Sequence, residues 1–126
     1  MGDNKEYLVN SEENGKVSIS EDVVAIVAAA AIVDVEGAAG LSTTIGKEIA
    51  DLFGKKNVSK GIRIQITEES TVIDAYVMIS YGYNVVEVSK KIQDTIKTAV
   101  ESMTGLKVDT VNVNVCGIAF DKNKNK

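Results

Sequence analysis

Residues 71–105, TVIDAYVMISYGYNVVEVSKKIQDTIKTAVESMTG, decide the fold of this chain. In the first part of the stretch every second residue is apolar: Ile73, Ala75, Val77 and Ile79. This alternation predicts a strand over 71–81 that buries one face in a core. The other face is half apolar, so the strand is either central in its sheet or covered by another element.

The second part of the stretch predicts a helix over 85–103. Asn84 is the expected N-cap, with Glu87 three residues later, and Gly105 is the expected stop. The apolar residues at helical spacing form one stripe: Val85, Val88, Ile92, Ile96, Ala99 and Met103. Lysines and an aspartate point away from this stripe, which predicts that the opposite side of the helix faces solvent.

Further strands are expected on both sides of this unit. Residues 16–20 alternate as a short strand. Residues 62–66 also alternate and precede a polar turn, so they should form an antiparallel hairpin with the strand at 71–81. The last strand, around 111–115, alternates Val with Asn, and the apolar parity changes after Gly117. That change predicts a β-bulge at the glycine.

A second long helix is expected over 21–34, with Ser20 as its N-cap. It is apolar nearly all round, and such helices are usually buried on more than one side. Two interpretations stay open: tight packing on its own sheet, or a helix shared with another subunit. A short amphipathic helix is expected through Ile45 and Phe53, ending at Gly54.

The predicted order is thus β-α-β-(α)-β-β-α-β, an α+β fold. Right-handed crossovers would place both long helices on one face of a mixed sheet, as a single-domain two-layer sandwich. We expect the domain to cover 15–120. The acidic N-terminal segment 1–14 and the Lys/Asn tail 121–126 are polar, so both are expected to be flexible.

Composition argues against most catalytic chemistry. The chain has no His and one Cys, so it has no imidazole base, no intrachain disulfide and no zinc cluster built from several thiols. Asp74 beside Tyr76 is the one acid expected to be partly buried, and a hydrogen bond or an interface is the favoured role for it. We therefore expect no enzyme, and we assign no catalytic, cofactor-binding or metal-binding residue.

One segment is concentrated in positive charge. Residues 55–63 carry four cations and no acid: Lys55, Lys56, Lys60 and Arg63. They form either a solvated loop or a contact for an anion such as RNA, lipid headgroups or an acidic protein surface. The net charge of −4 argues against general attraction to polyanions, and the segment lacks aromatic residues for base stacking. The GxxG pattern at 37–40 follows acidic residues, so turn-making glycines explain it better than phosphate binding.

Location is constrained by hydropathy. The longest apolar run, Val23 to Val33, is shorter than the roughly 20 residues that a membrane-spanning helix needs. The first ten residues lack the pattern of a secretory signal. With one free thiol, Cys116, the expected location is the cytoplasm.

Three stretches carry a family resemblance. They are VSISEDVV at 17–24 with the alanine-rich helix and Gly37, ISYGYNVVEV at 79–88 with Ile92-Gln93, and TGLKVDTVNVNVCGI at 104–118. Together they resemble the bacterial alkaline shock protein family, also called the envelope stress response family, over about 15–120. The resemblance implies a small cytoplasmic, non-enzymatic protein of Gram-positive-type bacteria without catalytic residues.

The resemblance also implies how such a protein works. Relatives associate with the cell envelope through an integral-membrane partner and tend to self-assemble. Long charged or repetitive extensions of some relatives are missing here, so the chain is more similar to the short housekeeping branch, whose roles include regulation of lipid metabolism.

The expected function is therefore self-association, as a homo-oligomer, and docking on a membrane-anchored or metabolic protein partner. The candidate interface residues are Tyr76, Met78, Tyr81 and Tyr83, because aromatic residues and Met are enriched in protein interfaces. The alternative is a small KH-like nucleic-acid-binding module that uses the cations of 55–63.

Overall fold

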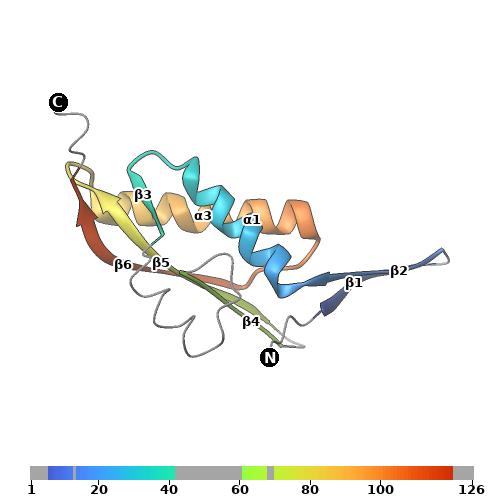
Figure 1. The fold of residues 1–126 in the computed structure, drawn as a ribbon. Helices are drawn as coiled ribbons and strands as arrows, with labels where there is room; N and C mark the ends of the chain where they lie inside the picture. Colours follow the sequence, from blue (N-terminus) through green and yellow to red (C-terminus); the bar gives the residue numbers. More distant parts are fainter. Residues whose placement is uncertain (1–5, 13, 42–60, 68–69, 121–126) are drawn as a thin grey trace.

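The structure, a computed structural model, describes residues 6–12, 14–41, 61–67 and 70–120. Figure 1 shows α1 and α3 together on one face of a sheet, with a separate hairpin projecting beyond it. The elements are β1 (Glu6–Glu12), β2 (Gly15–Ser20), α1 (Glu21–Val33), β3 (Ala38–Leu41), β4 (Ile62–Ile66), β5 (Thr71–Ser80), α3 (Val85–Thr104) and β6 (Thr110–Ala119). The predicted α+β fold, with two long helices on one face of a mixed sheet, is confirmed.

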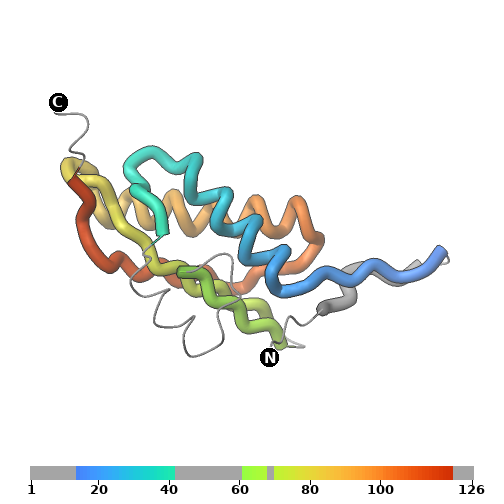
Figure 2. The backbone as a smooth tube through the Cα atoms, viewed as in Figure 1, coloured from blue at the N-terminus to red at the C-terminus, as the bar shows by residue number. Residues whose placement is uncertain are grey.

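β5 is the central strand of the four-stranded sheet. It pairs antiparallel with β3 and β4 and parallel with β6, so the sheet is mixed. The predicted hairpin is confirmed, with Ile62 opposite Ala75 and Ile66 opposite Thr71. A parallel pair needs a long crossover, and α3 supplies it between β5 and β6, as the tube in Figure 2 shows.

The predicted bulge lies in β6. Val77 pairs with Val115 but Met78 pairs with Gly117, so Cys116 is the extra residue. A Cβ built on Gly117 would lie 3.0 Å from Met78 Cε. The glycine therefore leaves room for the Met78 side chain across the sheet.

The core lies between β5 and the two helices. The apolar parity of β5 is fully buried: Ile73, Ala75, Val77 and Ile79 each have 0% exposure. These side chains belong to one cluster with the buried residues of α1 and α3. The alternation of β5 thus predicts the buried face correctly.

The buried stripe of α3 is displaced from the predicted one. It consists of Val88, Ile92, Ile96, Val100 and Thr104. Met103, expected in the stripe, is 71% exposed, and Val85 is 36% exposed. Successive buried positions follow the i, i+4 row that the sheet selects. Thr104 fits this row because its hydroxyl donates to the Val100 carbonyl at 2.6 Å.

The strand expected over 16–20 does not belong to the four-stranded sheet. β2 pairs antiparallel with β1 in a separate two-stranded sheet, so β2, α1 and β3 are not a crossover within one sheet. Within the segment 1–14, expected to be flexible, residues 6–12 form β1. Backbone pairing with β2 supports a strand whose composition is too polar to suggest one. The short helix expected through Ile45 and Phe53 lies outside the described residues.

The predicted helix caps are confirmed. The Ser20 hydroxyl accepts from the Val23 N–H at 3.4 Å, and Asn84 Oδ1 accepts from the Glu87 N–H at 2.9 Å. Gly105 ends α3 with a φ of +81°, a conformation that favours glycine. Local sequence therefore determines where both long helices begin.

Candidate functional site

The exposed side of α1 is entirely apolar. Its exposed residues are spaced by three, four and three positions along the helix: Val23, Ile26, Ala30 and Val33. We call these four residues the α1 stripe. Val23 is 40% exposed, Ile26 48% and Val33 76%. Because every residue from Val23 to Val33 is apolar, burying one side of this helix against the core necessarily leaves apolar side chains on the other.

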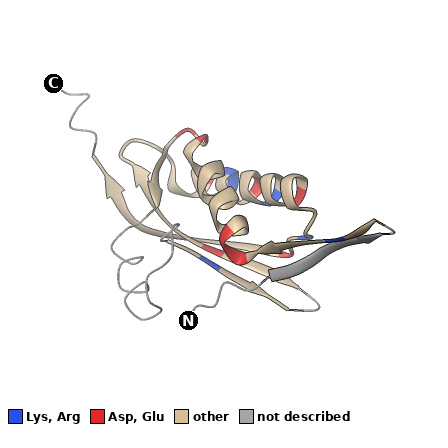
Figure 3. Ribbon diagram, turned by 45° about the vertical axis from the view of Figure 1, so that its right-hand side comes forward, with Lys and Arg blue, Asp and Glu red and all other residues tan. Residues whose placement is uncertain are grey.

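The exposed side of α3 differs from that of α1, because it is mainly polar. Most exposed residues in the middle of α3 are polar or charged: Lys90, Lys91, Gln93, Asp94, Lys97 and Thr98. Figure 3 shows charges along α3, whereas α1 carries acidic residues only near its two ends. An apolar stripe continuous over one side of a helix is typical of an interaction site, while scattered apolar residues are ordinary surface.

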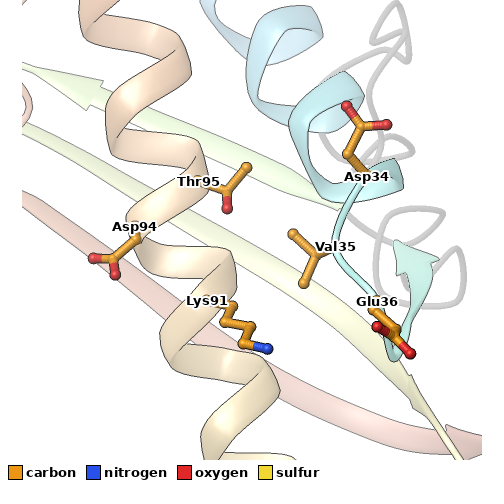
Figure 4. Close-up of a pocket in the computed structure, with 6 residues that line it drawn as sticks. All are labelled: Asp34, Val35, Glu36, Lys91, Asp94 and Thr95. Atoms are coloured by element: carbon orange, nitrogen blue, oxygen red, sulfur yellow. The ribbon is translucent and has the colours of Figure 1, made fainter.

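An acidic cleft lies where α1 ends. Val33 is followed by Asp34, then by buried Val35 and exposed Glu36. An open cleft of about 320 Å³ is lined by Asp34, Val35, Glu36, Lys91, Asp94 and Thr95. Figure 4 shows the two segments that form it, the turn after α1 and the facing side of α3. Three carboxylates against one ammonium make the lining acidic.

The cleft is better suited to a side chain than to a small molecule. Small-molecule pockets enclose most of their ligand and are mainly apolar. This cleft is open and mostly polar, and Val35 is the only apolar side chain in its lining. A cationic side chain of a partner would lie at the border of the cleft, near these carboxylates, without being enclosed.

Tyr83 supports one wall of the cleft. Its ring lies against Gly37, and its hydroxyl donates to Glu36 Oε2 at 3.4 Å. Gly37 has a φ of +94°, so this turn needs glycine for its backbone as well as for the space under the ring. The predicted interface residue Tyr83 thus has a structural contact, and it keeps 43% exposure.

Tyr81 belongs to an aromatic pair at the end of the sheet. Its ring stacks on Phe120 with centroids 4.8 Å apart, and both side chains are more than 60% exposed. The Tyr81 N–H donates to the Ala119 carbonyl at 2.8 Å, which holds the strand ends together. Phe120 was not among the predicted interface residues, and the change of apolar parity after Gly117 was the only signal for it in the sequence.

The other two predicted interface residues lie on β5, apart from Tyr81 and Tyr83. Tyr76 and Met78 are half-buried on the face of β5 opposite the core parity. The structure therefore divides the four predicted residues: two on the sheet face, one in an aromatic pair at the strand ends and one against the turn after α1. An interface role for any of them stays a prediction.

Arg63 lies on the same sheet face, beside Asp74. The two residues are register partners of β4 and β5, and Asp74 Oδ1 accepts from Asn112 Nδ2 at 2.8 Å. This hydrogen bond agrees with the favoured structural role for Asp74. Lys55, Lys56 and Lys60 lie outside the described residues, so the structure assembles only Arg63 of the predicted basic segment.

Cys116 is exposed at the bulge, and its thiol lies 3.7 Å from the Asn114 carbonyl. Among the residues that the structure describes, no group of three or more His, Cys, Asp or Glu is placed to hold a metal ion. Within the same residues, each helix is too short or too polar to cross a membrane.

Sequence reasoning missed the site built by the α1 stripe and the acidic cleft. The apolar character of α1 was evident, but not which of its residues face outward. The lining combines Asp34 and Glu36 with Asp94, about sixty residues later in the chain, because α1 packs on α3, and Figure 4 shows the Asp34 and Asp94 side chains pointing away from each other at the border of the cleft. The spacing of Val23, Ile26, Ala30 and Val33, followed directly by Asp34, was the available signal.

Similar proteins from two bacterial species match this chain over most of its length. The chain is 28% identical over 123 residues to the uncharacterized protein YqhY of Bacillus subtilis, covering 96% of this chain and 91% of that protein. It is 35% identical over 106 residues to YloU of the same organism, covering 82% and 88%. It is 36% identical over 115 residues to the uncharacterized protein Spy1535 of Streptococcus pyogenes, covering 90% and 87%.

No solved structure matches the chain. One family model matches residues 9–120, nearly all of the described fold, and its description is a cell envelope-related function. This match confirms the resemblance inferred from the three sequence stretches. The chain therefore belongs to the alkaline shock protein 23 family, with a cell envelope-related function.

Proposed function

We propose that this protein is a non-enzymatic interaction module of the cytoplasm. It self-associates and docks on a membrane-anchored or metabolic protein partner, and through that partner it serves the cell envelope. This proposal makes binding, rather than chemistry at a catalytic group, the activity of the molecule.

The observation that carries the docking part of the proposal is the α1 stripe. Burying apolar surface contributes about 25 cal/mol per Å², so exposed valine and isoleucine side chains in one row are a source of binding free energy. The stripe spans the helix from Val23 to Val33, and all four exposed residues of α1 belong to it. The stacked pair Tyr81 and Phe120 adds a second exposed apolar surface at the end of the sheet.

Family membership supports the same proposal. A cell envelope-related function requires a link to the envelope, and the described helices provide no membrane span of their own. A protein partner is the simplest link for a module with exposed apolar side chains.

The proposal is tested by comparing the full chain with the variant Ile26→Gln/Val33→Gln. Size-exclusion chromatography with light scattering measures the oligomeric state, and purification of the native complex followed by mass spectrometry identifies co-purifying proteins. We expect the wild type to be a dimer or larger and to retain envelope or metabolic proteins, and the variant to lose at least one of these associations.

The matched control is Val86→Gln, which replaces a 60% exposed apolar residue of α3, outside the stripe. It should associate like the wild type. A wild-type chain that is strictly monomeric and co-purifies with no specific protein would contradict the proposal.

A further inference from the structure

We infer that the α1 stripe and the acidic cleft form one docking surface for a basic amphipathic segment of a partner protein. The apolar side of that segment would cover the stripe, and a Lys or Arg at its end would enter the cleft. This inference rests on the proposed function, because it names the chemistry of the docking partner.

The stripe leads directly into the cleft. Val33, which is 76% exposed, is followed in the chain by Asp34, which lines the cleft. The stripe covers Val23 to Val33, about 15 Å at the rise of an α-helix. That length matches roughly three turns of a partner helix, with its next residues reaching the carboxylates.

The electrostatics at this end of α1 favour a cation. The C-terminus of a helix carries a partial negative charge, and the last turn of α1 contains no basic residue to offset it. Asp34, Glu36 and Asp94 add three carboxylates, and only Lys91 opposes them. A partner's ammonium or guanidinium group would therefore find an attractive potential beside the apolar stripe.

The same charges disfavour two other occupants. A second copy of α1 laid parallel on the first would place Asp34 against Asp34. An anionic lipid surface would be repelled by Asp34 and Glu36 beside the C-terminal end of the stripe. Apolar surface that is bordered by carboxylates fits a partner that borders its own apolar face with cations.

The probes for the test are two synthetic amphipathic helical peptides with the same leucine stripe. In one peptide the stripe is followed by a Lys-Arg pair, and in the other by a Glu pair. Fluorescence anisotropy measures their Kd for the full chain at low and high salt. We expect the basic peptide to bind at least about ten-fold tighter, and this advantage to shrink as salt rises.

Two sets of variants separate the apolar and the charged parts. Ile26→Gln/Val33→Gln should weaken binding of both peptides. Asp34→Asn/Glu36→Gln should weaken only the basic peptide, by about five-fold, the effect of a partly exposed charge pair. These two substitutions keep the side-chain shape, and Gln at position 36 still offers an oxygen to the Tyr83 hydroxyl. Asp74→Asn is the control, because it removes a carboxylate on the sheet face opposite the helices and keeps an oxygen for the Asn112 amide.

Several outcomes would overturn the inference. They are equal binding of the two peptides, no binding of either, or an effect of Asp34→Asn/Glu36→Gln no larger than that of Asp74→Asn. Binding to vesicles of anionic phospholipid that is lost in Ile26→Gln/Val33→Gln would assign the stripe to lipid instead. If the inference fails while oligomers and specific co-purifying proteins remain, the proposed function stands and its docking surface lies elsewhere.

Discussion

The ring of Tyr83 occupies the space that a side chain at Gly37 would need. A Cβ built on Gly37 would lie 2.7 Å from Tyr83 Cδ2 and 2.8 Å from Val88 Cγ2. The contact joins the turn after α1 to the segment before α3, and the Tyr83 hydroxyl reaches Glu36 in the same turn. The position of one wall of the acidic cleft therefore depends on this pair.

Gly37→Ala should lower the free energy of unfolding by about 3 kcal/mol, because it adds a steric overlap to an unfavourable positive φ. Urea unfolding measures the loss. Gly82→Ala is the matched control, since Gly82 has a φ of +98° but nothing within 4 Å of a built Cβ. It should lose only about 1 kcal/mol. Equal losses in the two variants would mean that the Tyr83 contact does not resist a side chain at position 37.

Replacing two apolar residues of α3 should have very different effects. Ile96 is fully buried, so Ile96→Ala should cost about 2–5 kcal/mol through lost burial and a cavity. Met103 is 71% exposed, so Met103→Ala should change stability by less than about 0.5 kcal/mol. Thermal or urea unfolding of both variants compares them. A large loss for Met103→Ala would favour the stripe expected from sequence over the observed one.

Gln93 links α3 to β6. Its Nε2 donates to the Val111 carbonyl at 3.0 Å, so Gln93→Ala should cost about 1 kcal/mol even though alanine favours the helix. Thr98→Ala, at another exposed position of the same helix, should be neutral or slightly stabilising. Urea unfolding again provides the comparison, and a Gln93→Ala variant as stable as Thr98→Ala would show that water replaces the amide without cost.

Asn84 caps α3 through its side-chain oxygen. Asn84→Ala should cost about 1 kcal/mol, whereas Asn84→Asp should keep the stability because it retains the acceptor and adds a negative charge at the helix N-terminus. Circular dichroism during thermal unfolding measures both. If the alanine and aspartate variants were equally destabilised, the cap would owe its effect to the amide group rather than to its oxygen.

Local signals predicted the elements of this fold well. The alternation of Ile73 and Val77, the capping residues Ser20 and Asn84, and the parity change at Gly117 act over a few residues. They are visible without knowing what packs against them. The pairing of β2 with β1 was not predicted, because ladder hydrogen bonds form between backbones and leave little trace in a polar sequence.

The candidate site was predicted less well. Side-chain type suggested Tyr76, Met78, Tyr81 and Tyr83 as one interface, but the pleat of β5 and the turn after it direct these residues to different places. A helix that is apolar all round gives no signal for its outward side. Whether Val24 or Ile26 is exposed is decided by the sheet and by α3.

The sequence by itself determined the kinds of element, their caps and the absence of histidine and thiol-pair chemistry, because these depend on composition and on neighbours within a few residues. It also carried the three stretches that indicate the family. Only the tertiary structure decided which side of α1 stays in solvent and placed Asp94 of α3 in the lining of one cleft with Asp34 and Glu36. The physical reason is that burial and charge clustering are properties of packed elements far apart in the chain, and an entirely apolar helix contains no polar residue to mark its outward face.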